Sequence, residues 1–223
     1  MKIVSWNCNG KFREKYSFLG SLNADIYVVQ ECENPKKYKK QFEGFYSDYI
    51  WYGEKDSKGL GIFVRENIEF VINDWPIYCL RHFLSIRINN DFDLIGVWAS
   101  PPYIEEYYIY QTVNLERYNS RTIIIGDFNS NAIWDKSHGR RNHSAVVNEL
   151  KNVGLYSAYH FMMNEKEGEE SQKTFYLYRH YDKGYHIDYC FLDPRRINSF
   201  QILTTNDWIQ YSDHFPIEIC VDT

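Results

Sequence analysis

The chain has 223 residues and a mass of 26.8 kDa, which is enough to build a sizeable core in one large domain over residues 1–223. Its formal net charge of −5 argues against a protein that coats nucleic acid through overall charge, but it leaves room for local contacts with a few phosphates. The first residues turn polar too soon for a signal peptide and no apolar run approaches membrane-spanning length, so we expect a cytoplasmic protein that contacts no membrane.

Strands and helical segments alternate near the start of the chain. Lys2–Trp6 (KIVSW) and Ile26–Gln30 (IYVVQ) have the apolar, β-branched composition of strands. Between them, Arg13–Leu22 carries enough helix-compatible residues to predict a short helix.

From Tyr46 to Trp98 the pattern is one of consecutive short strands separated by Gly, Asn and Asp. Gly59–Gly61 (GLG) and Asn89–Asp91 (NND) predict hairpin turns, so we expect an antiparallel meander here. After this region, apolar and aromatic residues at helical spacing over Glu105–Tyr118 predict a helix.

The stretch Thr122–Asn131 (TIIIGDFNSN) contains three consecutive isoleucines before Gly126, which predict a short strand buried on both faces. Ser144–Val153 predicts an amphipathic helix closed by Gly154. Four further runs, TFYLY, HIDYCFL, INSFQILTT and FPIEICV, predict strands. Together the elements favour an α/β (α+β) fold in which two mixed, mainly antiparallel sheets pack face to face with helices outside.

Polar side chains gather where the predicted strands begin or end. They are Asn7 and Asn9 after the first strand, Glu31 after the second, Asp127 and Asn129 after the central one, Asp188 within HIDYCFL, and Asp213 with His214 before the last. Each alone fits a turn or a strand-end charge, but α/β sheets bind ligands at the carboxyl ends of strands. Carboxylate and amide oxygens suit Mg²⁺ or Mn²⁺, whereas the five cysteines include no C-x-x-C pair and we find no Cys/His set for zinc. A phosphodiester hydrolase needs a cation, a base for water and donors for developing charge, which these residue types can supply.

Five motifs, in order along the chain, resemble the endonuclease/exonuclease/phosphatase superfamily. They are SWNCNG (Ser5–Gly10), VVQE (Val28–Glu31), GDFN (Gly126–Asn129), HIDY (His186–Tyr189) and SDHFPI (Ser212–Ile217). The resemblance spans Lys2 to Val221, and it implies a four-layer α/β sandwich and Mg²⁺-dependent phosphoester hydrolysis, with Mn²⁺ as the alternative cation.

The resemblance also implies roles for the residues that match its motifs. Glu31 is similar to the principal metal ligand, with Asn9 and Asp213 as further contributors. Asp127 would orient or deprotonate the attacking water.

The remaining matched residues would act on the phosphate. Asn7 and Asn129 would hold the scissile phosphate and its transition state, and His214 would stabilise the phosphate charge. Asp188 would orient His214, which also makes physical sense because a carboxylate fixes the tautomer of an imidazole and favours its protonated form. One position departs from the family: many members carry Tyr or His before the residue matching Pro101, where this chain has VWASPP.

The leading interpretation is a monomeric DNA nuclease. The run KTFYLYRHYDKGYHIDY interleaves basic residues such as Lys173 and Arg179 with aromatic ones. Basic and aromatic side chains together can follow a nucleic-acid backbone and stack on its bases. An ordinary tyrosine-rich edge strand explains the pattern equally well. Trp134, after the central motif, would either shape the substrate pocket or belong to the core.

Two other interpretations stay open. The first is a phosphatase for a small, inositol-type or lipid-derived phosphate, which the acidic composition favours slightly and which would respond weakly to salt. The second is a catalytically silent phospholigand-binding protein. The presence of both Asp127 and His214 argues against that second alternative, since a silent protein has no chemical need for them. DNA against RNA, and endonuclease against exonuclease action, do not follow from the sequence.

Overall fold

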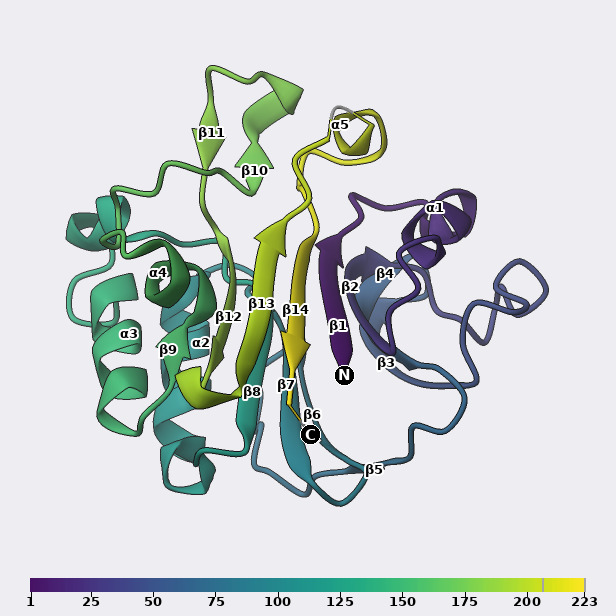
Figure 1. Cartoon of the computed structure of the whole chain (residues 1–223), viewed down its shortest axis with the longest axis horizontal. Helices are drawn as coiled ribbons and strands as arrows, with labels where there is room; N and C mark the ends of the chain where they lie inside the picture. Colours follow the sequence, from purple (N-terminus) through teal and green to yellow (C-terminus); the bar gives the residue numbers. More distant parts are fainter. Residues whose placement is uncertain (206, 223) are drawn as a thin grey trace.

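Residues 1–205 and 207–222, which the computed structural model describes, form two six-stranded sheets packed face to face (Figure 1). The first sheet has the order β13-β14-β1-β2-β4-β3 and the second β5-β6-β7-β8-β12-β9. β1 with β2, and β7 with β8, run parallel, and the other pairs of neighbouring strands in these sheets run antiparallel. The predicted fold class is confirmed.

The elements have the following bounds. The first sheet consists of β1 (Lys2–Asn7), β2 (Ile26–Cys32), β3 (Asp48–Lys55), β4 (Lys58–Val64), β13 (Ile197–Ile202) and β14 (Ile217–Val221). The second consists of β5 (Phe70–Ile72), β6 (Phe83–Ile88), β7 (Phe92–Trp98), β8 (Thr122–Asp127), β9 (Tyr156–Ser157) and β12 (Asp188–Leu192). A separate hairpin pairs β10 (Phe175–Tyr176) with β11 (Gly184–Tyr185). The helices are α1 (Tyr16–Gly20), α2 (Ile104–Asn114), α3 (His143–Asn152), α4 (Ala158–Met163) and α5 (Trp208–Tyr211).

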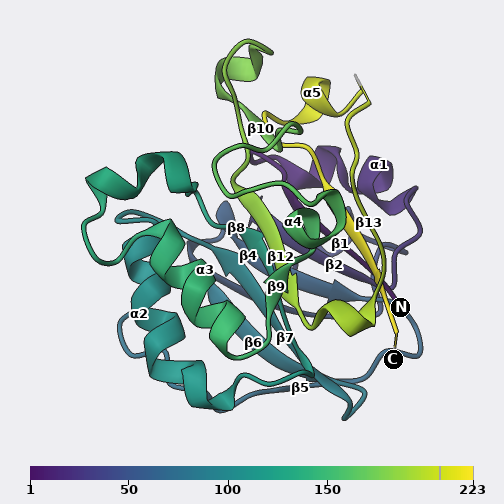
Figure 2. The ribbon, with the colours of Figure 1, turned by 60° about the vertical axis from the view of Figure 1, so that its left-hand side comes forward.

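β8 is buried along its whole length, as its isoleucine run predicts. Ile123 and Ile125 belong to the core that includes the space between the sheets, whereas Ile124 belongs to a second core beneath α2 and α3. Alternate side chains of a strand point to opposite faces, so this strand needs apolar residues at consecutive positions. The view in Figure 2 shows α2 and α3 along the outer side of the second sheet.

The predicted helices are present with shifted bounds. The segment expected as one helix from Arg13 to Leu22 forms a 3-10 turn over Phe12–Glu14 followed by α1. The helix predicted after the prolines is α2, and the one closed by Gly154 is α3, where Gly154 has the left-handed φ of +83° typical of a helix end. Among the described residues, no helix has both the length and the apolar character needed to cross a bilayer.

The two turns predicted in the meander have different outcomes. The Asn89–Asp91 turn is confirmed, since Asn89 and Asn90 have φ of 47° and 52°, as a tight hairpin requires. The turn predicted at Gly59–Gly61 is wrong, because these glycines lie inside β4 and the turn falls at residues 56–57. Gly59 is needed for packing instead: a Cβ there would lie 2.5 Å from the Trp51 ring.

The meander is also divided between the sheets. β3 and β4 join the first sheet, and β5 to β7 join the second, so the chain crosses from one sheet to the other after Val64. The strand predicted at TFYLY is short because Tyr178 and Arg179 take φ of 55° and 60°, which no strand accommodates.

This architecture brings several strand ends to one edge of the molecule. β1 and β2 are parallel, so their carboxyl ends lie together, and β8 contacts both strands from the facing sheet. The hairpin β10–β11 and helix α5 project at this edge (Figures 1 and 2). Candidate residues far apart in the sequence therefore meet here.

Candidate active site

Asp127, the last residue of β8, lies at the centre of this edge and is fully buried. Its Oδ1 accepts a hydrogen bond from the Asn129 backbone N–H at 2.8 Å, and its Oδ2 accepts from the side-chain amides of Asn7 at 2.9 Å and Asn129 at 3.0 Å. Asn129 also donates to the carbonyl of Ala99 at 3.1 Å. These bonds fix the orientation of the carboxylate, and their donors come from the end of β1 and from the segment after β8.

His214 and Asp188 form a buried pair beside Asp127. Nδ1 of His214 lies 2.9 Å from Oδ2 of Asp188, and Asp188 lies opposite Asp127 in the register of β12 and β8. One ligand atom from each of the three side chains falls within 4.8 Å of the others. The structure therefore brings together an acid, a histidine and its partner carboxylate, as the sequence predicts.

The charges of this group shift the pKa values of its members. Burial raises the pKa of Asp127 to about 7, although His214 opposes the rise. Burial acts to lower the pKa of His214, but the carboxylates of Asp188 and Asp127 outweigh it and raise that pKa to about 10. The arrangement thus favours a cationic imidazole next to a carboxyl group that can exchange a proton near neutral pH.

Two residues that the sequence analysis missed hold this pair in place. The Ser212 hydroxyl donates to the Asn7 carbonyl at 2.7 Å and accepts the N–H of His214 at 3.0 Å. The Thr174 hydroxyl oxygen accepts the N–H groups of Ile187 and Asp188. Ser212 stands directly before Asp213 and His214 in the motif, which was a usable signal, whereas nothing in the sequence points to Thr174.

Glu31 reaches the same edge through an irregularity in β2. The register with β4 shifts between Gln30 and Cys32, and Glu31 has a left-handed φ of 62°. A bulge of this kind re-aims a side chain at the end of a strand. Glu31 Oε1 lies 3.5 Å from the Asn7 amide nitrogen, and Oε2 lies 2.7 Å from the ammonium of Lys58, a contact with no signal in the sequence.

Asn9 and Asp213 lie together at the open side of the edge. The Asn9 side-chain amide donates to Asp213 Oδ1 at 2.9 Å, and Asn9 has a left-handed φ of 52°. Strained backbone of this type clusters at functional sites.

At this edge, two sets of described side chains could hold a divalent cation. Asp127, Asp188 and His214 are the most closely grouped, but the hydrogen bond of His214 to Asp188 already occupies one ring nitrogen and the carboxylate. Glu31, with Asn9 and Asp213, offers hard oxygen ligands on the more exposed side, and Lys58 already places a positive charge on Glu31. The second set fits a hard cation better.

Known proteins share this architecture. A sequence profile of the Endonuclease/Exonuclease/phosphatase family matches residues 4–214. The chain belongs to this family. A search of curated proteins gave no match. Among solved structures, the chain resembles the 3′ phosphatase NExo from Neisseria bound to product DNA hairpin, with 20% identity and a TM-score of 0.73. It also resembles an AP endonuclease from Archaeoglobus fulgidus, with 19% identity and a TM-score of 0.74. Both alignments cover 100% of this chain and 100% of the other. NExo has also been solved as a 3′-5′ exonuclease, with the same identity, TM-score and coverage.

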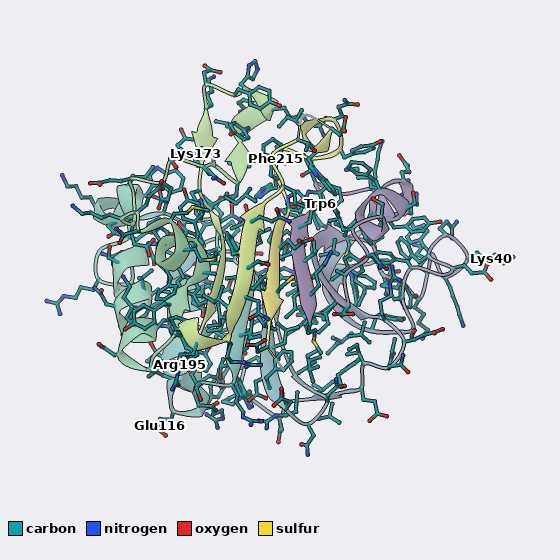
Figure 3. All side chains as sticks on the ribbon, in the orientation of Figure 1. Trp6, Lys40, Glu116, Lys173, Arg195 and Phe215 are labelled. Atoms are coloured by element: carbon teal, nitrogen blue, oxygen red, sulfur yellow. The ribbon has the colours of Figure 1, made fainter. Side chains whose placement is uncertain are left out.

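The three substrate-binding candidates lie outside the group centred on Asp127. The Lys173 ammonium donates to the carbonyl of Glu170, and Figure 3 shows Lys173 at the same end of the molecule as Trp6 and Phe215. Arg179 is exposed and donates to the carbonyls of residues 210 and 211 at 3.2 and 3.4 Å, which ties the hairpin to α5. Trp134 is partly buried and packs on Tyr185, with ring centroids 5.0 Å apart.

The position where the chain departs from the family's Tyr or His is at the edge of the site. Trp98 ends β7 opposite Asp127, and its ring lies 4.4 Å from that of His82. His82 Nδ1 lies 2.8 Å from the Ser100 hydroxyl, and the ammonium of Lys58 lies 5.6 Å from the Trp98 ring centroid. Trp98 therefore lies at this edge with a histidine from a different segment, His82, packed against it.

Proposed function

We propose that the chain is a divalent-metal-dependent phosphodiester hydrolase that cuts DNA. The observation that carries the proposal is the Asp127 carboxylate, held by the amides of Asn7 and Asn129 and placed beside the pair of His214 and Asp188. Hydrolysis of a phosphodiester requires a proton acceptor next to a source of positive charge, and these residues provide both.

Each of these residues would have its own role in the reaction. Asp127 accepts a proton from the attacking water, whose oxygen forms the new bond to phosphorus while the ester P–O bond breaks. The leaving oxygen takes a proton from solvent, and Asp127 then returns its own proton to solvent. His214, kept cationic by Asp188, stabilises the negative charge that builds on the phosphate oxygens, together with the second amide hydrogen of Asn7. Loss of one such donor commonly reduces the rate by about a hundredfold or more. Both amide hydrogens of Asn129 are already donated to Asp127 and Ala99, so Asn129 positions Asp127 and does not hold the phosphate as the sequence predicted.

Glu31, with Asn9 and Asp213, would hold Mg²⁺, or Mn²⁺ in its place. The ion would polarise the phosphate and neutralise part of its charge. The partly exposed carboxylate of Glu31, re-aimed by the bulge and already paired with a cationic group, supports this assignment.

The hairpin β10–β11 favours DNA over a small phosphate ester. It is anchored at the site, because Phe175 forms a β-bridge with His214 and their rings lie 4.7 Å apart. Its projecting part carries Arg179 together with Tyr178, which is 76% exposed. A basic and aromatic projection next to a phosphate-cleaving centre suits a long substrate that continues beyond the scissile bond.

A panel of substrates tests the proposal. Wild-type protein and His214→Ala protein are incubated with labelled duplex DNA, the same duplex with an abasic site, single-stranded RNA and phosphomonoesters, each with Mg²⁺ or with EDTA. We expect Mg²⁺-dependent cleavage of DNA that His214→Ala lowers by about a hundredfold or more. Phosphate release from monoesters alone would replace DNA by a small phosphate as the substrate, and turnover of no substrate would favour a binding protein.

A further inference from the structure

A second group of ionisable side chains lies beside α4, apart from the residues around Asp127. His160 belongs to α4, and Glu167 and Glu170 follow it in the next loop. Nε2 of His160 lies 3.2 Å from Oε2 of Glu167 and 3.2 Å from Oε1 of Glu170, and the three atoms lie within 4.8 Å of one another. We call these three residues the His160 cluster.

The spacing of the His160 cluster resembles that of ligands around an ion. Zinc binds nitrogen and oxygen ligands at about 2.0–2.1 Å, so neighbouring ligands of a tetrahedral site lie about 3.3 Å apart. Direct hydrogen bonds between an imidazolium and a carboxylate are shorter, at about 2.7–2.9 Å. The two observed separations of 3.2 Å are compatible with the first value, and a single contact such as that of His138 with Glu105 has the same length. What distinguishes the His160 cluster is that two carboxylates approach one imidazole nitrogen, which has at most one hydrogen to donate.

Neighbouring groups fix the orientation of the possible ligands. The Ser157 hydroxyl contacts Nδ1 of His160 at 2.8 Å, which turns Nε2 toward the two carboxylates. Glu170 Oε1 accepts hydrogen bonds from the Asn131 side-chain amide at 2.9 Å and from the Gly168 N–H at 2.8 Å. Metal-binding histidines and carboxylates in proteins are held by contacts of this kind.

Two buried polar atoms without partners lie in or near the cluster. Within the described part of the chain, neither Oε1 of Glu167 nor Nε2 of His186 has a hydrogen-bond partner. His186 is only 1% exposed, its Nδ1 lies 3.0 Å from the carbonyl of Gln172, and its ring centroid is 5.8 Å from that of His160. The contact with a carbonyl places the ring proton on Nδ1, so Nε2 keeps a lone pair. Leaving such groups unpaired is costly, and an ion bound by Glu167 would reduce that cost for its second carboxylate oxygen.

We propose that the His160 cluster binds Zn²⁺, independently of any cation at Glu31. His160, Glu167 and Glu170 supply the ligands, and His143, whose Nε2 lies 3.3 Å from Glu167 Oε2, positions Glu167. A mixed set of imidazole and carboxylate ligands selects a first-row transition metal over Mg²⁺. Because Glu170 also contacts Asn131, the ion would tie α4 and its loop to the segment that follows Asp127.

Zinc stoichiometry tests this proposal. Full-length protein is stripped with a chelator, dialysed against Zn²⁺ in the presence of excess Mg²⁺, and measured by elemental analysis. We expect one equivalent of zinc in the wild type and in Glu31→Gln protein, and none in His160→Gln or Glu167→Gln protein. His138→Gln is the matched control, because His138 contacts a single glutamate, Glu105, at the same 3.2 Å.

A second readout covers variants that fold poorly. Zinc should raise the Tm of the stripped wild type and of His138→Gln but not that of Glu167→Gln, whose fold is checked by circular dichroism. If the folded wild type retains no zinc, or if folded Glu167→Gln retains a full equivalent, the cluster is an ion-paired network without a metal and the proposal is wrong.

Discussion

Single residues at the site take unusual backbone conformations. Asn9, Glu31 and Asn129 all have φ between 46° and 62°, a region that residues other than glycine rarely enter. Two are asparagines, which tolerate it best, but Glu31 is not, so the bulge in β2 must hold it there. These backbone conformations help to direct three of the predicted site residues toward the same edge of the molecule.

Lys58 should compete with the cation for Glu31. Replacing it by methionine removes the positive charge that lies 2.7 Å from Glu31 Oε2, so Mg²⁺ should bind more tightly. We expect Lys58→Met to lower the Mg²⁺ concentration for half-maximal activity several-fold. A Mg²⁺ titration of the hydrolysis rate measures this, with Lys36→Met, an exposed lysine, as the control. A higher Mg²⁺ requirement would show instead that Lys58 supports the site.

Glu31→Gln should have the opposite effect. It keeps the size of the side chain but removes the charge that would hold the ion. We expect the half-activating Mg²⁺ concentration to rise at least about tenfold while the Tm changes little, because Glu31 is partly exposed and surface ion pairs contribute little stability. An unchanged Mg²⁺ titration would exclude Glu31 as the principal ligand.

At the scale of elements, the end of β8 depends on a close approach between neighbouring strands. A Cβ on Gly126 would lie 2.0 Å from the carbonyl oxygen of Val97 in β7, and Gly126 has a φ of 151°. The glycine that precedes Asp127 is therefore required by packing, and it determines where that carboxylate emerges.

Gly126→Ala should accordingly distort the pairing of β7 with β8. We expect a loss of about 2 kcal/mol or more in the free energy of unfolding together with a large loss of activity. Gly139→Ala is the control, because it also has a positive φ but no atom within 4 Å of its Cβ. Urea denaturation compares them, and equal losses for the two variants would contradict the packing argument.

The hairpin β10–β11 should carry the salt-dependent part of DNA binding. Each phosphate contact that is removed lowers the slope of log affinity against log salt concentration by about 1. We expect Lys183→Gln and Arg179→Gln, measured by fluorescence anisotropy on labelled duplex, to weaken binding and reduce this slope. Lys40→Gln is the control, since Lys40 lies across the molecule from Lys173 (Figure 3). An unaltered slope in both hairpin variants would place the DNA elsewhere.

At the scale of the whole molecule, local patterns predicted most of the architecture. The isoleucines of β8 and the turn at Asn89–Asp91 each depend on neighbouring residues, so both predictions are confirmed. The prediction at the glycines of β4 was wrong, because Gly59 leaves room for the Trp51 ring and Gly61 for Phe63 and Cys32. The contacts with Trp51 and Cys32 depend on how the strands pair. The crossing between the sheets after Val64 is likewise a long-range choice.

The difference between features set by local patterns and features set by long-range contacts also applies to the two sites. Motif residues such as Asp127 and His214 could be predicted to meet because each stands at a strand end. Lys58, Thr174 and the His160 cluster could not, since their partners come from segments whose arrangement no local pattern records. The sequence shows no Cys/His set for zinc, and a cluster of one histidine and two glutamates is a different kind of ligand set that no short motif marks.

The most direct test of the central claim is the single-turnover rate of cleavage of labelled duplex DNA by Asp127→Asn protein, with Mg²⁺. An asparagine fills the same space but cannot accept the proton of the attacking water, so the rate should fall by about a hundredfold or more. Asp135→Asn, in the following turn, should cleave at the wild-type rate. Near-normal cleavage by folded Asp127→Asn protein would contradict the account, because Asp127 would then not be the proton acceptor.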